Sequence, residues 1–256
     1  MLRISQSLIK SYYDYRREEL CGILFQAKYI DQSVESEPSD AMKEGIYFEY
    51  LCTGSLPKSG KIPEPEVDRN GRLKEAYKRI EKQVELFKKI IAHYKIKIIK
   101  AGYALYDDRK SGVIDIYAEF KGQKVFIDTK YSGLLDNKWS EMGWHPERLA
   151  ENDTLMVQGV HYKILAEDIL GIKDIPFYYF VFNSKKENDA KIILQEVDPD
   201  KVEKHREVID TVYGMVQREI KEGFTPYPKY RDCVQCPLFD SCEYAQRVPE
   251  IEVVQY

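Results

Sequence analysis

The sequence lacks the long apolar runs and the basic excess that mark membrane proteins and histone-like DNA-binding proteins. No apolar stretch approaches the roughly 18–20 residues that a membrane-spanning helix requires. The N-terminus has neither a continuous apolar stretch nor a small-residue cleavage site, so we expect no signal peptide and a cytoplasmic protein without membrane contact. The formal net charge of −4 argues against a surface coated with basic residues, although it is compatible with a local basic groove.

Cysteine and histidine are also scarce, at five and four residues, and the chain has no internal repeat or low-complexity block. Thiols stay reduced in the cytoplasm, which argues against a disulfide framework. Tyrosine is abundant, at 20 of 256 residues, and hydrophobic residues make up 43%, which is enough for one large domain. We expect most tyrosines in the core or in half-buried strands, while exposed ones are suited to stacking on bases.

The spacing of apolar residues predicts helices, then a mostly antiparallel sheet interrupted by a helix, then a helix and a cysteine-rich tail. Ser5 or Ser7 is suited to cap the first helix. Helices are expected over residues 5–20, 39–51, 74–94, 152–170 and 198–223. Strands are expected over residues 96–107, in both arms of 112–133, and over 175–183 and 190–197. This order indicates an α/β or α+β fold that forms a single domain over residues 1–256.

The predicted hairpin over residues 112–133 carries charged residues among apolar ones. Gly122 at the first central position of the turn indicates a two-residue type II′ loop, which places Asp115 opposite Lys130. Because side chains alternate along a strand, Asp115, Asp128 and Lys130 are then expected on one face.

Two interpretations of this charged group compete. A surface salt-bridge cluster would contribute only about 0–1 kcal/mol to stability. Alternatively, the two carboxylates supply the oxygen ligands that a hard divalent cation prefers, with the lysine beside it. In that case the lysine would position or deprotonate a water and stabilise charge that develops on a phosphate.

The second interpretation gains support from a resemblance to a known family. Gly112-x-x-Asp115, followed by Asp128-Thr129-Lys130, resembles the core motif of the PD-(D/E)xK nucleases. The resemblance implies a restriction-endonuclease-like central mixed sheet flanked by helices. It also implies that Asp115, Asp128 and the Thr129 carbonyl bind magnesium or manganese, and that Lys130 acts on the attacking water.

Two further patterns are similar to the RecB-like branch of this family. Gln158-x3-Tyr162 lies on the helix after the core strands, and the resemblance implies that this pair lines the active site and contacts nucleic acid. The two residues share one helix face, although such a pair is common on any helix. Gly45 and Glu49 resemble the first motif of the branch, which contributes an acidic metal ligand, here Glu49.

Many members of the branch also have a histidine near the first motif. In this chain Tyr47 and Phe48 occupy that neighbourhood, so a histidine ligand is not expected there. His145 and His161 are alternative ligands, and each is also compatible with an ordinary polar role.

Three cysteines lie close together near the C-terminus, as Cys233-x2-Cys236-x5-Cys242. Chance, a disulfide, zinc and an iron–sulfur cluster compete as explanations. Structural zinc usually shows two separated pairs, or one pair with matching histidines, and no second pair is present. Three clustered thiolates with one distant thiolate suit an iron–sulfur cluster better.

This spacing also matches the iron–sulfur RecB-like nucleases, which include AddB-type subunits and the CRISPR adaptation nucleases. The resemblance implies a 4Fe–4S cluster whose fourth ligand comes from near the N-terminus, which favours Cys21 over its rival Cys52. Residues 1–30 and 225–248 would then form the cluster region, and residues 39–223 the nuclease core. The cluster would join the two ends of the chain and stabilise the fold without redox work.

The connection over residues 137–153 is long and carries both tryptophans, Trp139 and Trp144. Long ordered loops near an active site are often functional, so one of the two is a candidate for stacking on a base. Coverage of the core is the equally plain alternative.

Together these motifs predict a metal-dependent DNA nuclease, and in particular an exonuclease that acts on ends or single strands in DNA repair, recombination or processing. Binding through phosphates should weaken steeply with salt. The alternatives are a non-catalytic iron–sulfur or zinc DNA-binding module on a nuclease fold, and a structure-specific endonuclease. The sequence does not identify a partner helicase or recombinase.

Overall fold

The computed structural model describes residues 2–35, 38–57, 60–133 and 158–249 of the chain. The first helices are α1 (Gln6–Arg16), α2 (Gly22–Tyr29), α3 (Asp40–Thr53) and α4 (Glu75–His93). The middle of the chain forms β1 (Lys97–Tyr106), β2 (Ser111–Phe120), β3 (Gln123–Ser132), α5 (Gln158–Leu165) and the π-helix η2 (Ala166–Leu170). The last part of the chain forms β4 (Phe177–Asn183), β5 (Ala190–Gln195), α6 (Pro199–Glu222) and α7 (Tyr230–Cys233). No helix among these described residues is both long and apolar enough to span a membrane.

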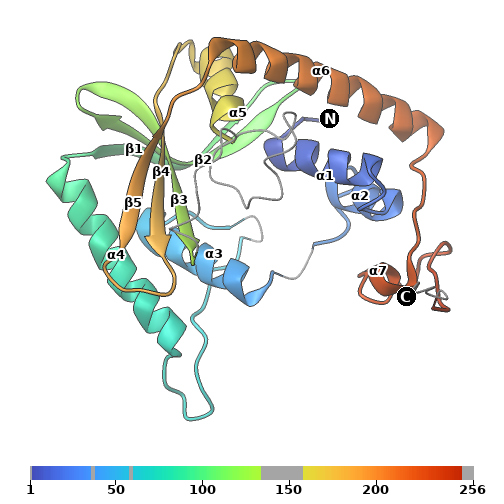
Figure 1. The fold of residues 1–256 in the computed structure, drawn as a ribbon, viewed down its shortest axis with the longest axis horizontal. Helices are drawn as coiled ribbons and strands as arrows, with labels where there is room; N and C mark the ends of the chain where they lie inside the picture. The colour runs from blue at the N-terminus through green and yellow to red at the C-terminus, as the bar shows by residue number, and fades with distance from the viewer. Residues whose placement is uncertain (1, 36–37, 58–59, 134–157, 250–256) are drawn as a thin grey trace, which may run out of the picture.

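Within the described residues, five strands form one sheet in the order β1-β2-β3-β4-β5. Neighbouring strands are antiparallel except β3 and β4, which run parallel. A parallel pair needs a crossover, and α5 belongs to the segment that makes it. Helices α3 and α4 cover one face, and α5 with η2 covers the other (Figure 1). The predicted mixed sheet flanked by helices is therefore confirmed.

The alternation of side chains along β3 decides which groups reach which face. Val125 and Ile127 belong to the apolar cluster beneath α3 and α4. Phe126, between them, belongs to the cluster beneath α5 and η2. Asp128 and Lys130 continue the parity of Phe126, so the charged residues emerge on the α5 side where the apolar run ends.

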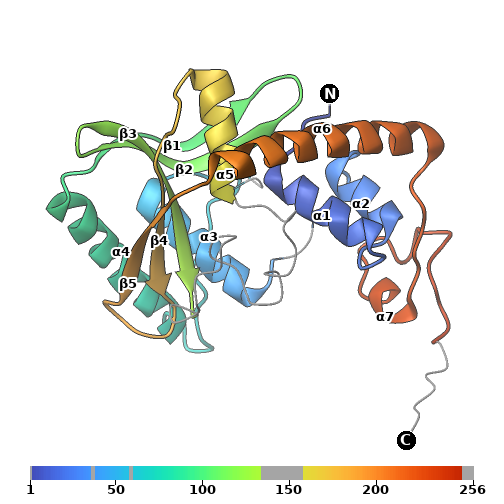
Figure 2. The same ribbon diagram turned by 45° about the horizontal axis from the view of Figure 1, so that its top comes forward.

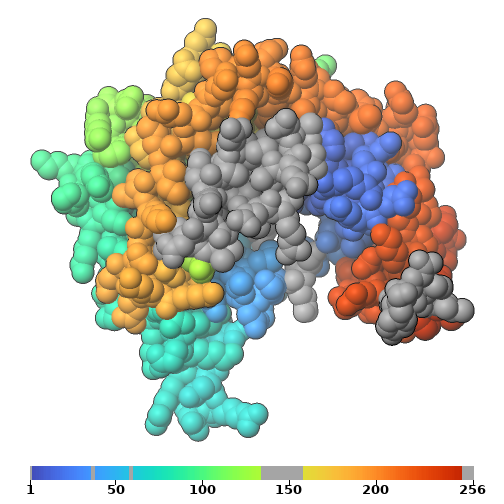
Figure 3. Space-filling model, viewed as in Figure 1, coloured from blue at the N-terminus to red at the C-terminus, as the bar shows by residue number. Residues whose placement is uncertain are grey.

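A third apolar cluster joins the two ends of the chain. It contains Leu8 and Tyr12 of α1, Phe25 of α2, and Ile209 and Val216 of α6. Helix α6 runs from the sheet across α1 and α2, and the tail with α7 descends beside them (Figures 1 and 2). In the space-filling view the N-terminal helices and the tail lie together, on the side of the molecule away from α4 (Figure 3).

The first helix is shorter than predicted, and a second helix follows that the sequence pattern did not reveal. Ser5 caps α1 as expected, accepting from the Leu8 amide at 3.2 Å, but the helix ends at Arg16. Glu18 adopts a positive φ of 60°, which interrupts the helical path. Helix α2 has only eight residues, and Phe25 holds it by ring contacts with Tyr12, Tyr15, Tyr29 and Phe224.

The predicted register of the β2–β3 hairpin is wrong by two residues. Both Lys121 and Gly122 have positive φ, of 51° and 80°, which is the type I′ pattern rather than type II′. Phe120 therefore pairs with Gln123, and Ile116 with Ile127. The paired residues end at Ile116 and Ile127, and this register does not place Asp115 opposite Lys130 as predicted. Alternation does not run unbroken through Asp115, because Ile114 and Ile116 belong to apolar clusters on opposite faces of the sheet. The shared face of Asp115 with Asp128 and Lys130 therefore stays a prediction.

Candidate functional site

The charged residues of β2 and β3 form the centre of the site. Asp115 Oδ2 accepts hydrogen bonds from the Thr129 amide at 2.8 Å and from Thr129 Oγ1 at 3.0 Å. Lys130 Nζ lies 2.6 Å from Asp128 Oδ2. The Asp128 side chain is only 2% exposed and that of Lys130 32%, so this ion pair is not the surface salt bridge that the sequence left open.

Helix α5 brings the predicted glutamine and tyrosine to these strands. Gln158 Nε2 donates to Asp128 Oδ1 at 2.6 Å, and Gln158 Oε1 accepts from Lys130 Nζ at 3.1 Å. Tyr162 OH lies 3.1 Å from Gln158 Nε2 and donates to the Val113 carbonyl at 2.8 Å. One amide thus bridges the carboxylate and the ammonium, and the i, i+4 pair acts as a unit.

Glu49 of α3 completes a group of three carboxyls, here called the carboxyl cluster: Glu49, Asp115 and Asp128. Burial raises the pKa of Glu49, and the charge of Asp128 raises it further against the opposing effect of Lys130. Burial likewise raises the pKa of Asp115 well above its usual range, with contributions from Asp128 and Glu49. The three carboxyls therefore interact electrostatically in a buried environment.

Lys130 is the cation within this cluster. Burial acts to lower the pKa of Lys130, but the charges of Asp128 and Asp115 outweigh it and raise that pKa. The side chain therefore remains an ammonium, which suits positioning a water or stabilising negative charge better than removing a proton.

The donor set fits a hard divalent cation. Three carboxylates and one ammonium leave an excess of negative charge in a buried site, and oxygen ligands are those that magnesium and manganese prefer. Asp128 Oδ2 is buried and accepts no hydrogen bond of good geometry, so its lone pair faces only the Lys130 ammonium. As the described side chains stand, no three of His, Cys, Asp or Glu are arranged to hold a metal ion. For an ion to bind at Asp128 Oδ2, the Lys130 ammonium would have to move away from that oxygen, whereas Gln158 could keep its hydrogen bond to Oδ1.

Two glycines let α5 approach the sheet closely. The sequence analysis did not identify this packing role for either of them. A Cβ on Gly112 would lie 2.7 Å from both Leu165 Cδ1 and Tyr162 Cε1. A Cβ on Gly159, the residue after Gln158, would lie 2.2 Å from Gln195 Oε1. The only local signal was a glycine within a predicted helix, and it does not show which side chains approach that glycine.

The tail cysteines, Cys233, Cys236 and Cys242, lie near Cys21. Burial raises the pKa of Cys236, a backbone hydrogen bond at Leu238 opposes this, and the nearby thiolates of Cys21, Cys242 and Cys233 raise it further. The two chain ends also meet where Lys229 Nζ donates to the Glu18 carbonyl at 2.7 Å. All five cysteines are free thiols, and the described ones do not stand in metal-binding geometry.

Cys52, the rival for the fourth cluster position, lies elsewhere. Burial raises its pKa, Lys88 opposes this, and the charges of Glu49 and Asp115 add to it. Cys52 therefore lies beside the carboxyl cluster and not beside the tail cysteines. Of the two candidates, the structure brings only Cys21 to the tail.

The remaining predicted residues separate into two groups. His161 is fully buried, and both ring nitrogens are engaged, with His205 and with the Ser111 carbonyl, so it does not face the carboxyl cluster. Trp139, Trp144 and His145 lie outside the described residues, as does the predicted helical stretch over 152–157.

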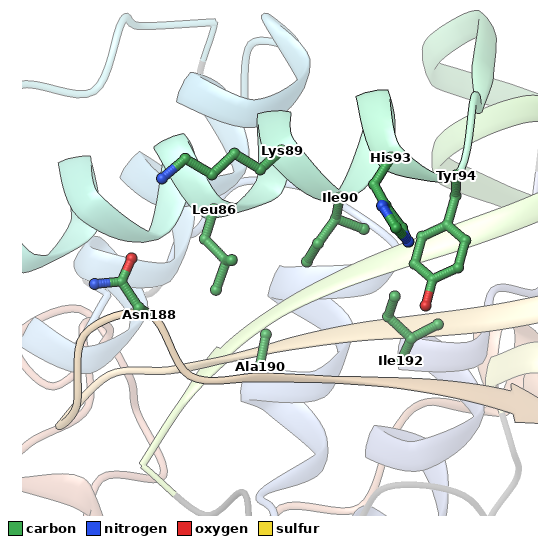
Figure 4. Close-up of a pocket in the computed structure, with 8 residues that line it drawn as sticks. All are labelled: Leu86, Lys89, Ile90, His93, Tyr94, Asn188, Ala190 and Ile192. Atoms are coloured by element: carbon green, nitrogen blue, oxygen red, sulfur yellow. The ribbon is translucent and has the colours of Figure 1, made fainter.

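A separate groove of about 610 Å³ lies between α4 and β5 (Figure 4). Leu86 and Ile90 of α4 face Ala190 and Ile192 of β5 across it, with Lys89 on its rim. No residue predicted for the site lines this groove, so it is distinct from the carboxyl cluster.

Comparison with known proteins identifies the fold. No protein-family model and no curated protein matches the chain. Among solved structures, the chain is similar to a crystal structure of a protein from Eubacterium rectale named "Putative exonuclease". The TM-score is 0.65 at 19% identity, with 98% of this chain and 91% of that chain covered. The chain therefore shares the fold of that protein over nearly its whole length.

Proposed function

We propose that the chain is a metal-dependent DNA nuclease that hydrolyses phosphodiester bonds, and in particular an exonuclease acting on ends or single strands. The observation that carries this proposal is the convergence of Glu49, Asp115 and Asp128 with an ammonium and an amide at one end of β2 and β3. The shared fold with a protein named as an exonuclease supports it.

Glu49, Asp115, Asp128 and the Thr129 carbonyl would hold magnesium or manganese. When bound, such an ion activates water and neutralises charge on the phosphate. The Lys130 ammonium would orient the attacking water and stabilise the negative charge that grows on the phosphoryl oxygens. Gln158 and Tyr162 would hold the DNA strand so that its scissile phosphorus faces that water, and one P–O bond forms as the other breaks.

We further propose that Cys21, Cys233, Cys236 and Cys242 hold a 4Fe–4S cluster with a structural role. The proposal rests on the approach of Cys21 to the three tail cysteines, which lie more than 200 residues away in the sequence. A cluster between them would close nearly the whole chain into a loop and would disfavour the unfolded state. Zinc at the same thiolates is the alternative that metal analysis would reveal.

One set of measurements tests both proposals. The protein is purified anaerobically, its visible absorbance and its iron, sulfide and zinc contents are recorded, and magnesium- or manganese-dependent degradation of end-labelled linear and circular DNA is followed. Asp128→Asn should abolish cleavage and keep the colour. The matched control Glu203→Gln, which neutralises an exposed carboxyl on α6, should change neither.

Cleavage of linear DNA alone would support an exonuclease, whereas cleavage of circles would indicate an endonuclease. Salt-sensitive DNA binding without metal-stimulated cleavage would favour the DNA-binding module instead. An Asp128→Asn variant that cleaves at the wild-type rate would overturn the assignment of the carboxyl cluster.

A further inference from the structure

Two buried histidines link α6, α5 and β2 behind the candidate site. His161 on α5 is 0% exposed and His205 on α6 is 3% exposed. His161 Nδ1 lies 3.1 Å from His205 Nε2, and His161 Nε2 lies 3.0 Å from the carbonyl oxygen of Ser111, the first residue of β2. Neither ring takes part in the proposed hydrolysis.

The direction of these hydrogen bonds follows from the chemistry of the partners. A carbonyl oxygen only accepts, so His161 must carry its proton on Nε2. A neutral imidazole has one N–H, which makes His161 Nδ1 an acceptor and His205 Nε2 the donor to it. Burial lowers the pKa of both rings, that of His161 to about 4, so both are neutral near pH 7.

The donor role of His205 Nε2 leaves the second nitrogen of this neutral ring as an acceptor. This nitrogen, Nδ1, is buried and has no hydrogen-bond partner. A buried polar atom without a partner costs about 1–3 kcal/mol, a penalty that an apolar side chain at this position would avoid. Through its other nitrogen, Nε2, the ring makes the hydrogen bond to His161.

Helix α5 is thereby bonded to β2 by two consecutive side chains. His161 donates to the Ser111 carbonyl, and Tyr162 donates to the Val113 carbonyl at 2.8 Å. Gln158 lies one turn earlier on the same helix, where its amide must present nitrogen to Asp128 and oxygen to Lys130. Any rotation of α5 about its axis would separate these groups.

We propose that His205 and His161 are positioning residues: a hydrogen-bond relay from α6 through α5 to β2 that fixes the rotation of α5 and hence the placement of Gln158 against Asp128 and Lys130. This inference rests on the proposed nuclease function. The relay touches neither substrate nor metal ligand, and it acts through the helix that carries Gln158 and Tyr162.

The surrounding charges are consistent with a relay of neutral rings. Lys110, which faces His161, is paired with Asp107 at 2.6 Å and with Asp168 at 2.9 Å. Arg206, next to His205, is paired with Asp168 at 2.7 Å and with Glu167 at 2.8 Å. Each of these two cations is therefore paired with carboxylates, and the two share Asp168.

The test compares three variants of the full chain. His205→Leu removes the donor, and His205→Gln keeps an N–H near the position of Nε2. The control Val212→Ala weakens the packing of α6 in the apolar cluster that joins the two ends of the chain, and it leaves both histidines in place. At a temperature where all variants are folded, we expect His205→Leu to lower kcat for DNA cleavage about tenfold or more with KM nearly unchanged. His205→Gln should recover most of kcat, and Val212→Ala should stay within about twofold of the wild type.

A folded His205→Leu protein with wild-type kcat would overturn the relay, and so would a His205→Gln protein as impaired as His205→Leu. Nitrogen-15 NMR of the imidazoles gives a readout that needs no activity, since both rings should be Nε2–H tautomers. A His161 ring protonated on Nδ1 would overturn the proposal. If the wild type cleaved no DNA, the nuclease function would fail, and these spectra with amide exchange along α5 in the same variants would decide the relay alone.

Discussion

Replacing one glycine in α5 by alanine should destabilise the protein, whereas the same change in α6 should stabilise it. A Cβ on Gly159 would lie 2.2 Å from Gln195 Oε1 and 2.8 Å from Phe177 Cδ1. Both side chains are nearly completely buried, at 5% and 0% exposure, so neither ring nor amide has room to yield. Gly214 in α6 is exposed, and its Cβ would meet nothing within 4 Å.

The two opposing contributions set the magnitude. Alanine is favoured over glycine in a helix by about 1 kcal/mol, which is the full expected gain at Gly214. Overpacking a buried site costs about 1–3 kcal/mol, so Gly159→Ala should lose up to about 2 kcal/mol after that gain is subtracted. For a chain of this size, the loss lowers Tm by up to about 8 °C, and Gly214→Ala raises it by about 2–4 °C.

Thermal unfolding followed by circular dichroism measures both shifts, and the cleavage assay adds a second readout. The added methyl group should push α5 away from β4 and withdraw Gln158 from Asp128, so Gly159→Ala should also cleave more slowly than its stability alone explains. A Gly159→Ala protein that melts at or above the wild-type temperature would show that α5 does not approach the sheet as described.

Three further predictions concern the site, the cysteines and the histidines. Gln158→Leu leaves Asp128 Oδ1 without its donor at 2.6 Å. It should therefore lower the free energy of unfolding in urea by about 1–3 kcal/mol and slow DNA cleavage. An unchanged urea midpoint would contradict the bridging role of Gln158. Cys21→Ser and Cys236→Ser should each remove the visible absorbance of the anaerobically purified protein and lower its Tm. Cys52→Ser should keep that absorbance. Loss of the absorbance in Cys52→Ser but not in Cys21→Ser would make Cys52 the fourth ligand. Burial lowers the pKa of His161 to about 4, so the contribution of the neutral ring to stability is fully present above about pH 6.5 and is lost as the pH falls towards 4. In urea titrations across that range, the free energy of unfolding of the wild type should fall by about 3 kcal/mol more than that of His161→Phe. Parallel pH dependences of the two proteins would refute this prediction.

The local patterns of the sequence predicted most of the helices and strands. The helix predicted over residues 39–51 is α3, and Ser39 caps it by accepting from the Met42 amide at 3.3 Å. Asp128 and Lys130 lie on one face of β3, as alternation along a single strand predicted, because alternation is a local property. The hairpin register was wrong because Gly122 is compatible with both primed turns, and only Lys121 in a left-handed conformation distinguishes them.

The elements that were missed depend on contacts between distant segments. Helix α2 is too short to show a periodic pattern, and it is held by aromatic rings from α1 and from Phe224 near the end of α6. The role of Gly159 is invisible without Gln195 and Phe177, which approach it from two strands. Neither can be read from spacing within one segment.

The sequence by itself determined which residue types stand on which strand and helix, and therefore that carboxylates, a lysine and an amide belong to neighbouring elements. Only the tertiary structure decided how they meet: that Gln158 joins Asp128 to Lys130, that Cys21 rather than Cys52 lies beside Cys236, and that His205 reaches His161 across 44 residues. The physical reason is range. Periodicity and turn chemistry act over a few residues, whereas these contacts arise when apolar faces of separate segments pack together and carry their polar side chains with them.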